Sequence, residues 1–267
     1  MNMTKLLPNE LQAISKEVRK DILKMIYGAG SGHPGGSLSS VEILVSLYFE
    51  VLGEGDHFFL SNGHICPALY SVMAEKGLID KNLLGSYTKF GSPLEGHPER
   101  TKLKGIENTS GPLGLGLAQA AGYAAGLKVD SKDGFIYCMT SDGEHDEGNH
   151  WEAVNFAAKY KLSNLIQIVD KNDIQIEGTV EEIMPLGNLK EKYEASGWNV
   201  IEINGHNFSE ILDAVEGAKQ EHNKLVVIIA NTIFGKGISF MEGNPDWHAK
   251  APNEEEFKKA MEELENE

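Results

Sequence analysis

The chain has 267 residues, 41% of them hydrophobic, which is enough for one large α/β domain with a buried core. Its formal net charge is −16 and no cluster of Lys and Arg forms a basic face, which argues against a nucleic-acid-binding surface. The two cysteines, Cys66 and Cys138, are far apart and indicate neither a disulfide framework nor a zinc site.

The N-terminal residues lack the apolar core of a signal peptide, and no stretch approaches the roughly 18 apolar residues of a membrane span. We therefore expect a soluble, cytoplasmic protein that binds neither membrane nor nucleic acid.

The first part of the chain predicts two helices. Apolar residues recur at spacings of three and four over residues 11–30, and Gly28 and Gly30 are expected to end this helix. A loop then leads to a second predicted helix over residues 39–52, with the serines from Ser37 to Ser40 as N-caps.

The rest of the chain alternates between strand and helix patterns. Residues 56–77 predict a short strand, a polar turn and a helix, and residues 111–128 predict a helix of small residues suited to close packing on a sheet. Apolar runs then predict four strands separated by helix-like segments, at residues 135–140, 165–169, 198–203 and 224–231. Such alternation predicts right-handed βαβ units, so the expected fold is α/β, a parallel sheet with helices on both faces.

The chain ends in a predicted acidic, amphipathic helix with a solvated face. No repeat, linker or change in composition marks a second domain. Residues 1–267 are therefore expected to form a single domain, with a helical N-terminal segment and an acidic C-terminal helix.

Polar residues follow two successive predicted strands. Asp142 and Gly143 follow the strand at 135–140, and Asn172 follows the strand at 165–169. Because the carboxyl ends of parallel strands meet at one sheet edge, these side chains are expected in one crevice. A carboxylate, an amide oxygen and a nearby carbonyl supply half of an octahedral cage for Mg²⁺, and the helix starting near Gly148 directs partial positive charge at an anion. The pair therefore predicts a metal-diphosphate site, although Asp142 taken alone is better explained as an ordinary turn or cap residue.

Seven motifs in order along the chain resemble those of transketolases, including the thiamine-diphosphate motif, here Ser-Asp-Gly followed by Lys-Asn-Asp. They are SGHPGGS at 31–37, SNGHICPALY at 61–70, EGHPE at 95–99, SGPLGLGLAQAAGYA at 110–124, SDGEHDEG at 141–148, DKNDIQIEG at 170–178 and HAKAPN at 248–253. Transketolases are usually more than twice this long. The chain thus resembles the N-terminal, diphosphate-binding subunit of a split transketolase, with the thiamine-diphosphate-binding fold.

The resemblance implies thiamine diphosphate as cofactor and a divalent metal, Mg²⁺ or else Ca²⁺ or Mn²⁺, held by Asp142, Asn172 and the carbonyl of Ile174. The residues that it implies for cofactor binding also include His64, Gly111, Pro112, Leu113, Gly143, Glu147 and His248. The residues that it implies for catalysis are His33, His64, His97, His248, Glu147 and Glu152, the two acids linking paired active sites across a subunit interface.

The histidines suit the implied chemistry, because cleaving a ketose between C2 and C3 needs a base and hydrogen-bond donors near neutral pH. Taken singly, His33 and His97 could instead stabilise turns. His145 and His206 are interpreted as turn or supporting residues, and His57, His150 and His222 have no context that favours catalysis.

Three positions depart from the family pattern. Ser141 replaces the first glycine of the motif, which requires that its backbone is not left-handed. Leu115 replaces a common glutamine, and Asp173 replaces a common glycine near the metal.

The implied activity is transfer of a two-carbon ketol unit from a ketose or ketose phosphate to an aldose or aldose phosphate, in carbohydrate metabolism such as the pentose phosphate pathway. The partner would be the C-terminal transketolase subunit, whose pyrimidine-binding domain supplies an activating glutamate, in an α2β2 heterotetramer. Alone, the chain is expected to be inert. The alternatives are a transketolase for an unusual sugar, another thiamine-diphosphate enzyme such as a deoxyxylulose-phosphate synthase or a 2-oxoacid decarboxylase, and a non-catalytic cofactor-binding regulatory subunit.

Overall fold

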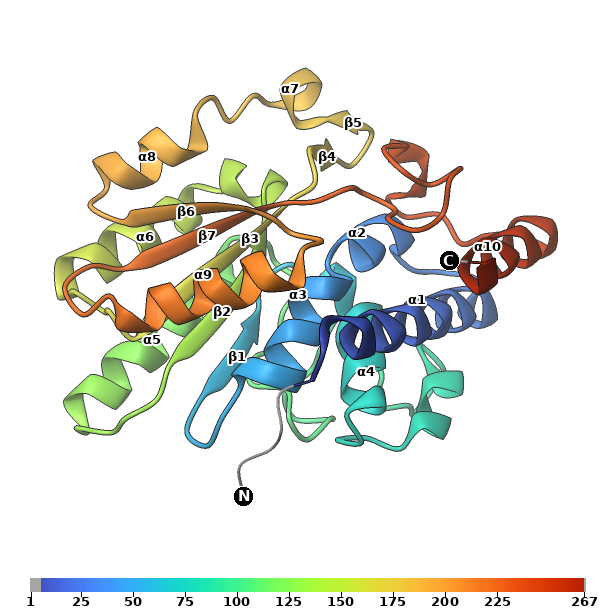
Figure 1. Ribbon diagram of the computed structural model, residues 1–267, viewed down its shortest axis with the longest axis horizontal. Helices are drawn as coiled ribbons and strands as arrows, with labels where there is room; N and C mark the ends of the chain where they lie inside the picture. The colour runs from blue at the N-terminus through green and yellow to red at the C-terminus, as the bar shows by residue number, and fades with distance from the viewer. Residues whose placement is uncertain (1–5, 267) are drawn as a thin grey trace.

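A five-stranded parallel sheet forms the centre of the protein, in a computed structural model that describes residues 6–266. The strand order is β1-β2-β3-β7-β6, and Figure 1 shows it running from β6 at the top to β1 at the bottom. A separate antiparallel hairpin pairs β4 with β5. The strands are β1 (His57–Leu60), β2 (Ile136–Ser141), β3 (Leu165–Lys171), β4 (Ile174–Gln175), β5 (Gly178–Thr179), β6 (Asn199–Asn204) and β7 (Val226–Asn231).

Helices cover both faces of the sheet. They are α1 (Pro8–Ala29), α2 (Pro34–Ser39), α3 (Val41–Ser46), α4 (Cys66–Glu75), α5 (Leu115–Val129), α6 (Gly148–Tyr160), α7 (Val180–Ile183), α8 (Leu189–Ala195), α9 (Phe208–Gln220) and α10 (Glu254–Asn266). Short 3-10 turns occupy Gly63–Ile65, Lys81–Ser86, Gly143–Asp146 and Pro245–Trp247, and a π-helical turn, Leu47–Val51, extends α3.

Two hydrophobic cores lie on opposite faces of the sheet. Successive residues of a strand point to opposite faces. Accordingly, Tyr137 and Met139 of β2 belong to the core under α1, α3, α4 and α9, whereas Ile136 and Cys138 belong to the core under α5, α6 and α8. The predicted parallel sheet with helices on both faces is therefore confirmed.

The helix boundaries agree with the predicted pattern except around the serines. Gly30 ends α1 in a left-handed conformation, with φ of 64°, while Gly28 lies inside the helix. Of the serines predicted as N-caps, Ser40 is the N-cap residue of α3, but its hydroxyl donates to the carbonyls of Gly36 and Ser37 and makes no capping hydrogen bond. Ser37 and Ser39 instead lie within an additional helix, α2.

A helix-like segment was predicted between β3 and β6, but the β4–β5 hairpin in this excursion was not. The excursion holds the β4–β5 hairpin, α7 and α8, and each strand of the hairpin has only two residues. A pair of residues is too short to show alternation in the sequence.

Both cysteines are buried and free. Within residues 6–266 we find no helix with the length and apolarity needed to cross a bilayer.

Helix α5 approaches the sheet unusually closely at one glycine. A Cβ atom on Gly116 would lie 2.4 Å from Cβ of Ser61, at the end of β1, and 2.5 Å from its Cα. The Gly116 N–H donates to the hydroxyl of Ser61 over 3.1 Å. Small residues in α5 therefore bring its first turn onto the edge of the sheet that carries the polar turns.

Replacing Gly116 with Ala should lower the free energy of unfolding by about 1–3 kcal/mol, because the added methyl overlaps backbone atoms of Ser61. The matched control is Gly217→Ala in α9, where nothing lies within 4 Å of the added methyl, and the gain in helix propensity should stabilise by up to about 1 kcal/mol. Urea denaturation of both variants measures the difference. Equal effects of the two substitutions would contradict the close approach.

Candidate functional site

The turns after β2 and β3 are directly hydrogen-bonded to each other. Ser141 and Asp170 are register partners in the parallel pair, and the Asp142 N–H donates to the Asp170 carbonyl over 3.2 Å. The Asp142 carboxylate accepts from the N–H groups of Gly143 (2.8 Å) and Asp173 (2.7 Å). The structure thus brings the acid after β2 against the turn that carries Asn172.

Asp170 orients Asn172 and was missed by the sequence reasoning. One oxygen of its buried carboxylate accepts from Asn172 Nδ2 (3.0 Å) and Ser39 Oγ (2.7 Å), and the other accepts from Thr232 Oγ1 (2.5 Å). Asn172 Oδ1 in turn accepts from the N–H of Ile174 over 3.1 Å. The available signal was an acid that directly follows the predicted strand at residues 165–169.

The buried acids at this edge suit a cation. Burial first, and then the nearby Asp170, raises the pKa of Asp142 to about 7, and burial raises the pKa of Asp170 itself. No Lys, Arg or His within residues 6–266 forms an ion pair with either carboxylate. A divalent cation would favour the ionised acids, and the predicted donors are all oxygens, as Mg²⁺ and Ca²⁺ prefer.

No cluster of three or more His, Cys, Asp or Glu side chains suited to a metal occurs in the described part of the chain. The predicted set is of another kind, with one carboxylate, one amide and one main-chain carbonyl. Asp142, Asn172 and Ile174 therefore fit a metal that takes its remaining ligands from a bound phosphate and water.

Backbone conformation explains two departures from the family pattern. Asp173 is left-handed, with φ of 61°, which is a conformation that glycine adopts without strain. Ser141 is not among the residues with positive φ, so a serine fits there.

Glu144 joins three segments of the site and was also missed. Its buried carboxylate accepts from Ser61 Oγ (2.5 Å), the Gly114 N–H (3.0 Å) and the Ser141 N–H (3.1 Å). Burial raises the pKa of Glu144 to about 7 despite these donors. Glu144 thus fixes the ends of β1 and β2 and the start of α5 relative to one another.

A cavity of about 290 Å³ opens beside these turns. The predicted site residues that line it are His33, His64, His97, Gly111, Leu113, Gly143, Glu147, Asn172, Ile174 and His248. Other lining residues were not predicted, notably Gln175, Ile176 and Phe234.

Three predicted residues do not line this cavity. Asp142 lines the adjoining pocket beneath the excursion, Pro112 is exposed in the loop before α5, and Glu152 is exposed on α6. Glu147 is the N-cap residue of α6 and directly precedes the helix. The link that Glu147 and Glu152 would make across a subunit interface stays a prediction.

Four histidines from four separate loops meet at the cavity. The ring centroid of His33 lies 5.3 Å from that of His64, 6.2 Å from that of His97 and 5.6 Å from that of His248, and the His64 and His248 centroids are 5.6 Å apart. The structure thus brings these four histidines together at one place.

Burial keeps the histidines neutral. It lowers the pKa of His64, His97 and His248, and burial followed by His248 and His97 lowers the pKa of His33 to about 4. Neutral imidazole offers one donor and one acceptor nitrogen. Nδ1 of His33 is buried without a hydrogen-bond partner and is therefore available to a ligand.

The opposite side of the cavity suits an anion. No side chain caps the N-terminus of α6, so its first N–H groups remain available beside Glu147 and Gly143. A Cβ on Gly143 would come within 3.2 Å of the Gln175 side chain, so a glycine keeps this approach open. The cavity therefore has an anion-binding side and a histidine side.

Comparison with known proteins identifies the family. Residues 11–267 match the family model described as transketolase, thiamine diphosphate binding domain. The chain belongs to the transketolase family.

Two curated relatives match along almost their whole length, and each is one subunit of a divided enzyme. The 6-deoxy-6-sulfo-D-fructose transketolase subunit SqwG of a Clostridium species is 42% identical over 97% of both chains. One of the subunits of the apulose-4-phosphate transketolase of Actinobacillus succinogenes is 41% identical over 100% of both. The crystal structure of transketolase from Campylobacter jejuni superposes with a TM-score of 0.89 at 33% identity, covering 97% of this chain but 43% of that one. The predicted resemblance to the N-terminal part of a divided transketolase is confirmed.

Protonation of His33 should destabilise the fold. Because its pKa is about 4 in the folded chain and near 6.5 when unfolded, the unfolded chain binds this proton first, and stability should fall as the pH drops from about 6.5 to 4. The imidazole NMR signals of His33, assigned by their loss in His33→Asn, should titrate near pH 4. A midpoint near 6.5 would contradict the desolvated cluster.

Proposed function

We propose that the chain is the cofactor-binding subunit of a two-polypeptide transketolase, which transfers a two-carbon ketol unit from a ketose or its phosphate to an aldose or its phosphate. The observation that carries this proposal is the cavity in which four neutral histidines face the Asn172 and Ile174 turn and the start of α6. Membership of the transketolase family supports it.

In this proposal, one side of the cavity binds the cofactor and the histidine side binds the sugar. Thiamine diphosphate, when bound, supplies the nucleophilic carbon to which the two-carbon unit is attached. We propose that Asp142, Asn172 and the Ile174 carbonyl hold Mg²⁺, with Ca²⁺ or Mn²⁺ as substitutes, and that the Gly143 turn and α6 bind the diphosphate oxygens.

The histidine side would handle the sugar. We propose that His33, His64, His97 and His248 donate to substrate oxygens through N–H and accept protons through the free ring nitrogen. Their neutral state at pH 7 makes acceptance possible, and their burial strengthens each hydrogen bond.

A partner polypeptide is the next element of the proposal. Full-length transketolase from Campylobacter jejuni is more than twice as long as the part that this chain covers. Exposed apolar side chains on α5, α6 and the excursion also favour a covering surface, and they are Leu115, Tyr123, Phe156, Tyr160, Ile176, Ile183 and Met184. We propose that a C-terminal transketolase subunit covers this side in an α2β2 assembly, and that the complex is cytoplasmic.

A specialised substrate is the second candidate. The two full-length relatives are named for sulfofructose and for apulose 4-phosphate, so we include unusual sugars, besides those of the pentose phosphate pathway, among the donors to be assayed.

The chain alone should show no ketol transfer, whereas co-expression with a pyrimidine-domain subunit should produce activity that needs thiamine diphosphate. EDTA should abolish it and Mg²⁺ should restore it, because the metal joins the diphosphate to the chain. The assay measures ketol transfer from a panel of ketose donors that includes a sulfosugar. Full activity of the isolated chain would refute the divided active site.

Asp170→Asn should weaken metal-dependent cofactor binding by about 10–100-fold, because Asp170 orients Asn172 without being a predicted ligand. Isothermal titration calorimetry of the assembled complex with thiamine diphosphate and Mg²⁺ measures this affinity. Asp213→Asn, at an exposed position of α9, is the matched control. Unchanged affinity in Asp170→Asn would contradict the assigned role of Asn172.

A further inference from the structure

The segment after β7 brings the rings of Phe234 and His248 to the cavity. A buried polar network outside the cavity holds this segment in place. Phe234 packs so tightly on α2 that a Cβ on Gly35 would lie 2.0 Å from its ring, and the Gly235 N–H donates to the Gly35 carbonyl over 3.0 Å. The Phe234 ring also lies parallel to that of His248, with 6.3 Å between centroids. The place of Phe234 therefore influences both His33, which precedes α2, and His248.

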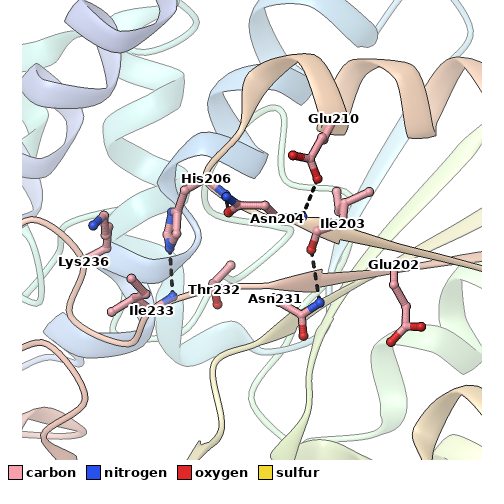
Figure 2. Close-up of a pocket in the computed structure, with 9 residues that line it drawn as sticks. All are labelled: Glu202, Ile203, Asn204, His206, Glu210, Asn231, Thr232, Ile233 and Lys236. Atoms are coloured by element: carbon pink, nitrogen blue, oxygen red, sulfur yellow. Dashed lines mark hydrogen bonds between the residues drawn. The ribbon is translucent and has the colours of Figure 1, made fainter.

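His206 holds this segment from the turn after β6. Figure 2 shows its ring reaching the start of the segment, where Nε2 accepts from the Ile233 N–H over 2.8 Å. Because Nε2 accepts a hydrogen bond, it carries no hydrogen itself. The ring's hydrogen is therefore on Nδ1, which lies 2.8 Å from a carboxylate oxygen of Glu42 on α3. The hydrogen-bond partners thus select one neutral tautomer.

Glu42 is itself fixed by a buried ion pair. Its carboxylate lies 2.7 Å from a guanidinium nitrogen of Arg19, and both side chains are almost fully buried. Arg19 Nε donates to the Lys236 carbonyl over 3.1 Å. Burial alone would raise the pKa of Glu42, but the charge of Arg19 and the hydrogen bond from His206 outweigh it and lower that pKa.

The turn that carries His206 is rigid as well. The Asn204 N–H donates to Glu210 over 2.8 Å, and Asn231 Nδ2 donates to the Ile203 carbonyl over 3.2 Å, as Figure 2 shows. The open groove between these residues, on the β6 and β7 side of the sheet edge, shares no lining residue with the histidine cavity.

We propose that His206, with the Arg19–Glu42 pair, is a positioning residue for the proposed transketolase reaction. It fixes the Ile233 N–H, and Arg19 fixes the Lys236 carbonyl, so Phe234 between them is held against Gly35 and His248. Misplacing reacting groups by about 1 Å costs up to about 100-fold in rate. The proposal rests on the proposed function for its kinetic effect and on the hydrogen bonds alone for its structural effect.

Two substitutions test separately the hydrogen bonds that His206 makes with Ile233 and with Glu42. His206→Asn retains a donor near the place of Nδ1 but cannot reach Ile233, whereas His206→Gln can accept from the Ile233 N–H through its amide oxygen but gives up the place of Nδ1. His222→Asn, at an exposed histidine, is the matched control.

In the complex with the partner subunit, His206→Asn should lower kcat by about 10-fold or more with a smaller change in the donor KM, and His206→Gln should stay within about three-fold of the wild type. His222→Asn should match the wild type. Wild-type kcat in His206→Asn, or equal loss in both His206 variants, would overturn the proposal.

Amide hydrogen exchange of the full chain without its partner provides the second measurement. Residues 232–237 should exchange faster in His206→Asn and stay protected in His206→Gln. An inactive wild-type complex would count against the proposed function only, because the exchange result still decides the role of His206. Unchanged exchange in His206→Asn would overturn that role.

Discussion

The parallel pairing of β2 with β3 is the constraint on which the site depends. Their register sets Ser141 opposite Asp170, so the two following turns share a hydrogen bond and the Asp142 carboxylate reaches the Asp173 N–H. If one of the two strands were shifted by one residue, its side chains would point to the opposite faces of the sheet and these groups would be separated. Apolar packing on both faces of the sheet holds this register. The core therefore determines where the polar groups at the sheet edge lie.

The same edge concentrates buried acids. Asp142, Glu144 and Asp170 are almost fully buried, and burial raises the pKa of each. Backbone N–H groups and hydroxyls compensate part of the desolvation cost, but no cationic side chain within residues 6–266 pairs with Asp142 or Asp170. Such an arrangement costs stability of the fold, which is the balance expected at a binding site.

The histidine side is organised differently, by loops held from outside the cavity. His33 is the N-cap residue of α2, His64 lies in the turn after β1, and His248 directly follows the 3-10 turn Pro245–Trp247. His206 accepts from the Ile233 N–H and Arg19 donates to the Lys236 carbonyl, and neither residue lines the cavity. Exposed apolar residues such as Ile176 also line this cavity.

The sequence by itself determined the α/β alternation and, through its ordered family motifs, named Asp142, Asn172 and the four histidines as candidate site residues, because periodicity and short motifs are local properties. Only the tertiary structure decided the strand order, the β4–β5 hairpin and the roles of Asp170, Glu144 and His206. Each of these residues acts through partners from distant parts of the chain, such as Ser39 and Thr232 for Asp170. Contacts of that kind follow from how the layers pack, which no local pattern of residues encodes.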